Sequence, residues 1–110
     1  KKVMEEMLPK LRSFAPDLII ISAGFDGHHD DVDGNRGMFH LVEDDFEWIT
    51  EELIQVANEQ AKGRIVSLLE GGYHVPKPTR KRKLPREESY VLTSALASCV
   101  AVHVKALMNA

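Results

Sequence analysis

Two runs of mostly aliphatic residues divide the chain. The first covers residues 18–21 (Leu-Ile-Ile-Ile) and the second covers residues 65–69 (Ile-Val-Ser-Leu-Leu). Apolar runs of this length, without polar alternation, are typical of strands covered on both faces, as in a parallel sheet. We therefore expect two parallel strands that are joined by a right-handed crossover.

Helical spacing of apolar positions predicts three further elements. A short helix is expected over residues 3–14, with Pro9 kinking or restarting it. A longer helix is expected over residues 43–62, with acids in its first turn and Gly63 at its end, and a last helix over roughly residues 87–108. The expected inner faces are Val3, Met7, Leu8, Leu11 and Phe14 in the first helix, Phe46, Ile49, Leu53, Val56 and Ala57 in the second, and Leu92, Leu96, Cys99, Val100, His103 and Leu107 in the last. The order α-β-α-β-α places the chain in the α/β class.

A two-stranded parallel sheet is incomplete by itself. Strands that are apolar on both faces need neighbouring strands at their edges and helices on both faces. Three helices can cover the faces, but nothing in the sequence covers two open edges. The chain also lacks an initiator Met and opens in helical sequence. We therefore expect a segment of one longer domain, completed by strands of the same or another polypeptide.

Composition narrows the class of protein. The chain has 110 residues, 44% of them hydrophobic, and a net charge of −3. This charge predicts no general attraction to nucleic acid or to an anionic membrane, and no apolar run is long enough to span a bilayer. The single Cys99 cannot form an internal disulfide, which fits a reducing compartment, the nucleus or the cytoplasm.

Each apolar run leads into a corner that contains glycine. Residues 22–26 (Ser-Ala-Gly-Phe-Asp) follow the first run and residues 70–73 (Glu-Gly-Gly-Tyr) follow the second. Binding and active sites of parallel sheets lie just beyond the carboxyl ends of the strands. Asp26 and Tyr73 are therefore expected to face one crevice. A carboxylate can hold a metal ion and a phenol can donate to an oxyanion. Taken alone, Asp26 would more often be a turn or helix-cap residue.

These segments resemble a known family. Residues 16–28 (PDLIIISAGFDGH) and residues 69–73 (LEGGY) are similar to two motifs of the histone deacetylase superfamily, and more narrowly to class II deacetylases and bacterial acetylpolyamine amidohydrolases. The similarity covers most of residues 3–75 and, more loosely, the last helix. It implies that residues 1–110 form the C-terminal portion of an arginase-like open parallel sheet, within a single deacetylase catalytic domain.

The resemblance also implies a chemistry. It indicates a zinc-dependent amide hydrolase that acts on acetyl-lysine in a histone or another protein, or on an acetylated polyamine. Asp26 takes the place of a Zn²⁺ ligand, and Tyr73 takes the place of the tyrosine that assists the metal at the substrate carbonyl. The residues implied in the substrate pocket are Gly24, Phe25, Gly71 and Gly72. The implied partners are the remaining N-terminal part of the domain and an acetylated protein, with no membrane and no direct nucleic-acid contact.

Other groups that the family needs are absent from this chain. They are two zinc ligands, an Asp and a His, and a tandem His pair for acid–base work, all upstream of the ligand Asp26. His28 and His29 imitate that pair but directly follow Asp26, so we expect them to be loop or supporting residues. The isolated chain is therefore expected to be inactive.

Several alternatives stay open. Residues 31–35 (Asp-Val-Asp-Gly-Asn) partly match the nucleophile motif of haloacid-dehalogenase-like phosphatases, but no apolar strand directly precedes them. They also match half of an EF-hand loop, without its central Gly and final Glu. A non-enzymatic alternative is an inactive deacetylase-like interaction module. The basic run 80–83 could act as a nuclear-import signal, although a solvated loop is the favoured interpretation, and Cys99 and His103 are expected to pack in the core.

Overall fold

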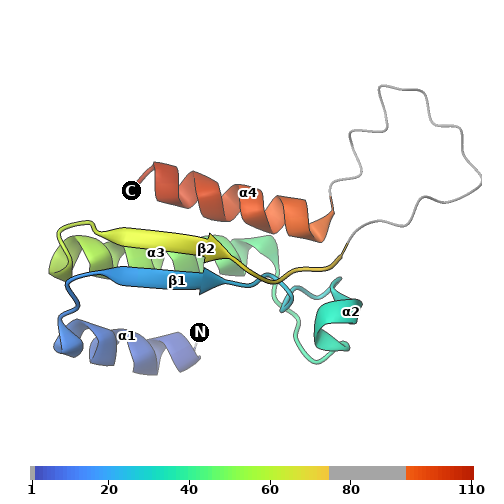
Figure 1. Ribbon diagram of the computed structural model, residues 1–110. Coiled ribbons are helices and arrows are strands. Elements are labelled where there is room, and N and C mark those ends of the chain that lie inside the picture. The colour runs from blue at the N-terminus through green and yellow to red at the C-terminus, as the bar shows by residue number, and fades with distance from the viewer. Residues whose placement is uncertain (1, 75–93) are drawn as a thin grey trace, which may run out of the picture.

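The computed structural model describes residues 2–74 and 94–110 (Figure 1). The elements in chain order are α1 (Lys2–Phe14), β1 (Ile19–Ala23), α2 (Val32–Asn35), α3 (Glu43–Gln60), β2 (Ile65–Leu69) and α4 (Ala95–Met108). The two strands pair in parallel, with Ile19 opposite Ile65 and Ala23 opposite Leu69. The α/β class and the parallel pairing of the two expected strands are confirmed.

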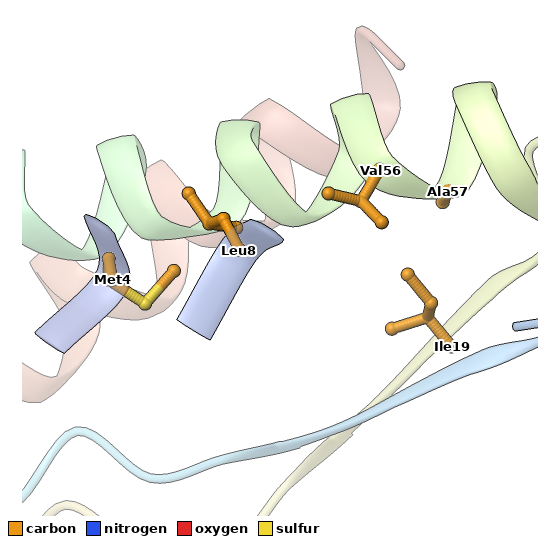
Figure 2. Close-up of a cluster of buried hydrophobic side chains, with 5 residues drawn as sticks. All are labelled: Met4, Leu8, Ile19, Val56 and Ala57. Atoms are coloured by element: carbon orange, nitrogen blue, oxygen red, sulfur yellow. The ribbon is translucent and has the colours of Figure 1, made fainter. Parts of the chain in front are cut away.

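The core lies between the sheet and α3, and two apolar clusters build it. The first joins α1, β1 and α3, and its buried members are Met4, Leu8, Ile19, Val56 and Ala57 (Figure 2). The second joins β1 and the residues after it to α3 and α4, through Ala23, Phe25, Phe46 and Cys99. Full burial of one side chain the size of Val or Phe stabilises the fold by about 1.5–3 kcal/mol, so these clusters hold the helices against the sheet.

The expected inner face of the first helix is partly wrong. Leu8 packs in the core and Leu11 against it, as expected, but the third core residue is Met4. Val3, Met7 and Phe14 are exposed. Two neighbouring apolar stripes run along this helix, and periodicity alone cannot choose between them because the choice depends on where the helix meets the sheet.

All three long helices contact the same face of the sheet. Ile19, Ile21 and Ile65 face the helices, whereas Ile20, Val66 and Leu68 on the opposite face are 62%, 46% and 54% exposed. The expectation that three helices cover both faces is therefore wrong. The physical reason is that α1 and α4 both pack against α3, which already lies on the covered face (Figure 1). In the described residues the sheet has two strands and thus two open edges.

We expect the isolated 110-residue chain to self-associate and to melt without a sharp transition. The bare sheet face and the two open edges offer apolar surface and unpaired backbone groups to other molecules. Light scattering after size-exclusion chromatography, at micromolar concentrations, measures the association. Ile20→Thr with Leu68→Thr should reduce it, and Val3→Thr, which changes an exposed residue of α1, is the matched control. A monomer with a sharp two-state melt would contradict the expectation.

The ends of the later helices are capped locally. The backbone N–H of Val42 donates to the Asp45 carboxylate at 3.0 Å, so Asp45 supplies half of a capping box for α3. Ser94 accepts from the Ala97 N–H at 3.1 Å and caps α4.

Two sequence-based expectations lie outside the described residues. They are the start of the last helix near residue 87 and the role of the basic run 80–83. Among the helices that the structure describes, none has the length and apolar character needed to cross a membrane.

His103 ties α4 to α3 and β2. Its ring is 3% exposed, with Nδ1 2.8 Å from the Thr50 hydroxyl and Nε2 2.8 Å from the Ser67 hydroxyl. The Thr50 hydroxyl donates to the Phe46 carbonyl, so it accepts from Nδ1, and Ser67 donates to Nε2. Burial lowers the pKa of His103 and favours this neutral ring. Burial also raises the pKa of the fully buried Cys99 thiol to about 12, and the expected core role of both residues is confirmed.

Candidate functional site

Both glycine corners lie at the carboxyl end of the sheet. Backbone pairing continues past the strands, because the Phe25 N–H donates to the Gly71 carbonyl at 2.8 Å and the Glu70 N–H donates to the Ala23 carbonyl at 3.0 Å. These bonds hold residues 24 and 71 side by side. The segments that leave the two strands therefore start from the same edge (Figure 1).

The Asp26 carboxylate lies against two glycines. A Cβ built on Gly24 or on Gly71 would stand 3.1 Å from Oδ1 of Asp26, which is tighter than nearly all real Cβ contacts. A side chain at either position would therefore push the carboxylate aside. Asp26 is half-buried, and none of the hydrogen bonds or salt bridges between described residues engages its carboxylate. A carboxylate that lies between two glycines and whose oxygens bind no other described residue fits a metal ligand.

Gly34 of α2 brings Asp26 and Tyr73 together. The point at which a Cβ on Gly34 would stand is 2.7 Å from Cβ of Asp26 and 3.0 Å from Cδ2 of Tyr73. The two side chains follow different strands, yet both contact this one residue. Tyr73 is 59% exposed, so much of this residue is accessible from solvent. Their roles in catalysis stay predictions.

The segment between Asp26 and α3 is more ordered than the expected polar loop. It contains α2 and is closed at its base, where the His29 N–H donates to the Leu41 carbonyl at 2.9 Å and the Leu41 N–H donates to the Gly27 carbonyl at 3.2 Å. The closed base holds α2 over the strand ends. This short helix is absent from the sequence-based expectation, because four residues are too few to show a helical period.

Two buried polar side chains of this loop bind backbone groups of the segments that carry Asp26 and Tyr73. The sequence analysis does not identify either of them as a site residue. Asp31 is 1% exposed, and its carboxylate accepts from the backbone N–H groups of Gly34, Tyr73 and His74. Asn35 is 4% exposed, and its Nδ2 donates to the backbone carbonyls of Asp26 and His28, at 2.8 Å each. An Asp three residues before the amide it caps is a readable signal. No local pattern indicates the contact with Tyr73, which lies 42 positions away.

His28 and His29 lie next to the site without forming part of it. His28 is 2% exposed, its Nδ1 accepts from the Asp30 N–H at 3.1 Å, and its Nε2 lies 3.3 Å from the Glu43 carboxylate. The backbone N–H of Glu43 lowers the pKa of its own carboxyl, and His28 adds to this effect. Side-chain atoms of His28, His29 and Asp30 lie within 4.8 Å of one another and could hold a metal ion. Both ring nitrogens of His28 are already engaged, however, so Asp26 is the better candidate ligand.

The remaining expected pocket residues divide between the site and the core. Phe25 is 3% exposed, and its ring centroid is 5.3 Å from that of Phe46 and 5.6 Å from that of His103. The Phe25 side chain packs into the covered face of the sheet, and Phe25 also borders a cavity next to Gly71 and Gly72. Its expected place in the substrate pocket stays a prediction. Gly72 has φ +131°, and a Cβ there would stand 2.5 Å from Cδ1 of Leu96. Glycine at this position is thus required by its backbone conformation and by the packing of α4.

Comparisons with known proteins agree with the strand-end motifs. The family model of the histone deacetylase domain matches residues 1–84. The type-2 histone deacetylase 2 of Dictyostelium discoideum is 40% identical over 106 residues, which are 96% of this chain and 5% of that protein. The type-2 histone deacetylase 1 of the same organism is 34% identical over 106 residues, 96% of this chain and 6% of that protein. Histone deacetylase 4 of Caenorhabditis briggsae is 40% identical over 67 residues, 61% of this chain and 7% of that protein.

The chain spans only 5% and 6% of the length of the two Dictyostelium relatives. Over that span, however, the similarity includes both glycine corners, the connecting helix and α4. The resemblance inferred from the two sequence motifs is confirmed, and the chain belongs to the histone deacetylase family.

Proposed function

We propose that this chain is part of a zinc-dependent deacetylase catalytic domain that hydrolyses acetyl-lysine amides in a histone or another protein. Asp26 would be one zinc ligand and Tyr73 would bind the substrate carbonyl. The observation that carries the proposal is the approach of both side chains to Gly34, at the ends of two paired strands. The names of the relatives, which are histone deacetylases, support the same reaction.

The site would contribute positioning and charge stabilisation to amide hydrolysis. In this reaction a water oxygen adds to the acetyl carbon, the C–N bond breaks, and the lysine nitrogen receives a proton. A zinc ion beside Asp26 would supply Lewis-acid polarisation of the carbonyl. The Tyr73 hydroxyl would donate a hydrogen bond to the carbonyl oxygen as that oxygen becomes negative. Gly24 and Gly71 leave room for the Asp26 carboxylate at the strand ends. We assign the proton transfers to groups outside this chain.

We further propose that the rest of the catalytic domain, in the same or a separate polypeptide, completes an arginase-like open sheet around residues 1–110. The exposure of Ile20, Val66 and Leu68 and the open edges of the described sheet support this proposal, since such surfaces are normally covered. The missing zinc ligands and acid–base groups would come from that part. The single Cys99 favours the nucleus or the cytoplasm as the location.

Acetate release by the full-length protein tests this function. We expect hydrolysis of an acetyl-lysine histone peptide, loss of the activity when a chelator removes the metal, and recovery when Zn²⁺ is added back. An acetylated polyamine, assayed at the same concentration, separates the two substrate classes that the family resemblance implies.

Two outcomes would contradict the proposal. A faster reaction with the polyamine than with the peptide would assign the protein to small-molecule amide hydrolysis. No hydrolysis of either substrate by protein that holds a full equivalent of zinc would favour the inactive interaction module.

A further inference from the structure

Asp31 is the most completely buried carboxylate in the described part of the chain, and the reaction outlined above does not use it. It is 1% exposed. One oxygen, Oδ1, accepts from the Gly34 N–H at 2.9 Å and caps α2. The other oxygen, Oδ2, accepts from the backbone N–H groups of Tyr73 and of His74, the latter at 3.2 Å. Asp31 therefore bridges the loop after β1 and the segment after β2.

A buried carboxylate is costly unless hydrogen bonds compensate it. Three backbone N–H groups do so for Asp31, and bonds to an ionised acceptor are stronger than those between neutral groups. Within the described residues Asp31 forms no salt bridge, so its bonding capacity is directed at the backbone. Both oxygens of Asp31 thus bind backbone N–H groups and anchor the chain. They are not free to act as a phosphatase nucleophile or as a calcium ligand, the two roles that the sequence of residues 31–35 partly suggests.

The anchor acts just after two glycines, past the last backbone hydrogen bond between the two strand ends, which Gly71 accepts from Phe25. Gly71 and Gly72 directly precede Tyr73, and glycines restrict φ and ψ less than any other residue. The Tyr73 side chain is 59% exposed and makes no hydrogen bond to another described residue. The direction of its ring therefore depends on its own backbone and on the contact of Cδ2 with Gly34. The bonds to Asp31 hold that backbone directly after the two glycines. On the other side of α2, Asn35 holds the Asp26 carbonyl.

We propose that Asp31 is a positioning residue that fixes Tyr73 relative to Asp26, so that the tyrosine hydroxyl meets the substrate carbonyl. This inference rests on the proposed function, because it assigns to Tyr73 a task in catalysis. It predicts that loss of the Oδ2 bonds lowers kcat through Tyr73, while the substrate KM and the zinc content change little.

Asp31→Ser in the full-length protein separates the anchor from the helix cap. A serine can still accept from the Gly34 N–H as an N-cap, but its side chain is too short to reach Tyr73. We expect kcat to fall about 10- to 100-fold, with KM and zinc content within about twofold, since poor alignment of a reacting group can cost about 100-fold. Asp31→Asn is a second variant of unchanged size, and Asp33→Asn, an exposed acid on the same short helix, is the matched control with unchanged kcat.

A double-mutant cycle with Tyr73→Phe decides whether Asp31 acts through the tyrosine. If it does, adding Asp31→Ser to Tyr73→Phe should lower kcat by less than about twofold. A full multiplicative loss would overturn the positioning role and leave the proposed function standing. A kcat unchanged by Tyr73→Phe alone would overturn both the positioning role of Asp31 and the proposed catalytic role of Tyr73, and that single variant identifies this case.

Amide hydrogen exchange tests the anchor without any activity. In Asp31→Ser, the amides of Tyr73 and His74 should exchange at least about tenfold faster than in the native protein, because their acceptor Oδ2 is lost. Asp31→Asn keeps one acceptor oxygen, so it should speed exchange less. Exchange at these two amides that stays at the native rate in Asp31→Ser, while other core amides remain protected, would overturn the inference.

Discussion

Replacing Asp26 by Asn in the full-length protein should remove its zinc and reduce deacetylation to background. The change keeps the size of the side chain between Gly24 and Gly71 but removes the negative charge that holds the cation. Even the loss of a partner group behind a metal ligand weakens binding by 10- to 100-fold, so loss of a ligand should exceed about 100-fold. Zinc content by mass spectrometry of the metal, and acetate release, measure the two effects.

The matched control for this experiment is His29→Ala. His29 belongs to the other group of described residues that could hold a metal ion, together with His28 and Asp30. If Asp26 is the ligand, His29→Ala should keep both zinc and activity, since His29 lies on the exposed side of the loop. Full zinc occupancy in Asp26→Asn, with loss of zinc in His29→Ala, would move the metal to the histidine group and contradict our assignment.

The sequence predicts the parts of the fold that depend on local periodicity. Both strands, the crossover helix and the parallel pairing agree with the structure, because unbroken apolar runs and an amphipathic stretch of 18 residues are strong signals. The side of the sheet on which each helix packs is not a local property. For that reason the covering of both faces was predicted wrongly, and Met4 rather than Val3 faces the core.

In the candidate site, too, the sequence predicts the features that depend on local motifs but not those that depend on tertiary contacts. Asp26 and Tyr73 were placed at one crevice, because parallel strands end at the same edge and two motifs mark those ends. The groups that hold them there were not predicted. Asp31 reaches Tyr73, and Asn35 reaches the Asp26 carbonyl, through a loop whose course the sequence does not show. The packing of the Phe25 ring against Phe46 and His103 was not predicted either, because those residues belong to helices whose position over the sheet is not a local property.

Tyr73→Phe in the full-length protein should lower kcat by about 100- to 1000-fold, which is the cost of removing one donor to a developing oxyanion. The phenyl ring keeps the contact with α2, where Cδ2 of Tyr73 adjoins Gly34, so the fold, the zinc content and the substrate KM should change little. A loss in kcat with KM unchanged identifies an interaction made in the transition state rather than in substrate binding. Steady-state kinetics on an acetyl-lysine peptide, together with metal analysis, measure all three quantities.

The control for this variant comes from the chain's other tyrosine. Tyr90→Phe removes the same hydroxyl from a residue outside both glycine motifs, and it should leave kcat within about twofold. If Tyr73→Phe raises KM and leaves kcat unchanged, the hydroxyl binds the substrate and the transition state equally, because such uniform binding does not change the chemical step. Carbonyl activation would then have to come from the metal and from groups outside this chain.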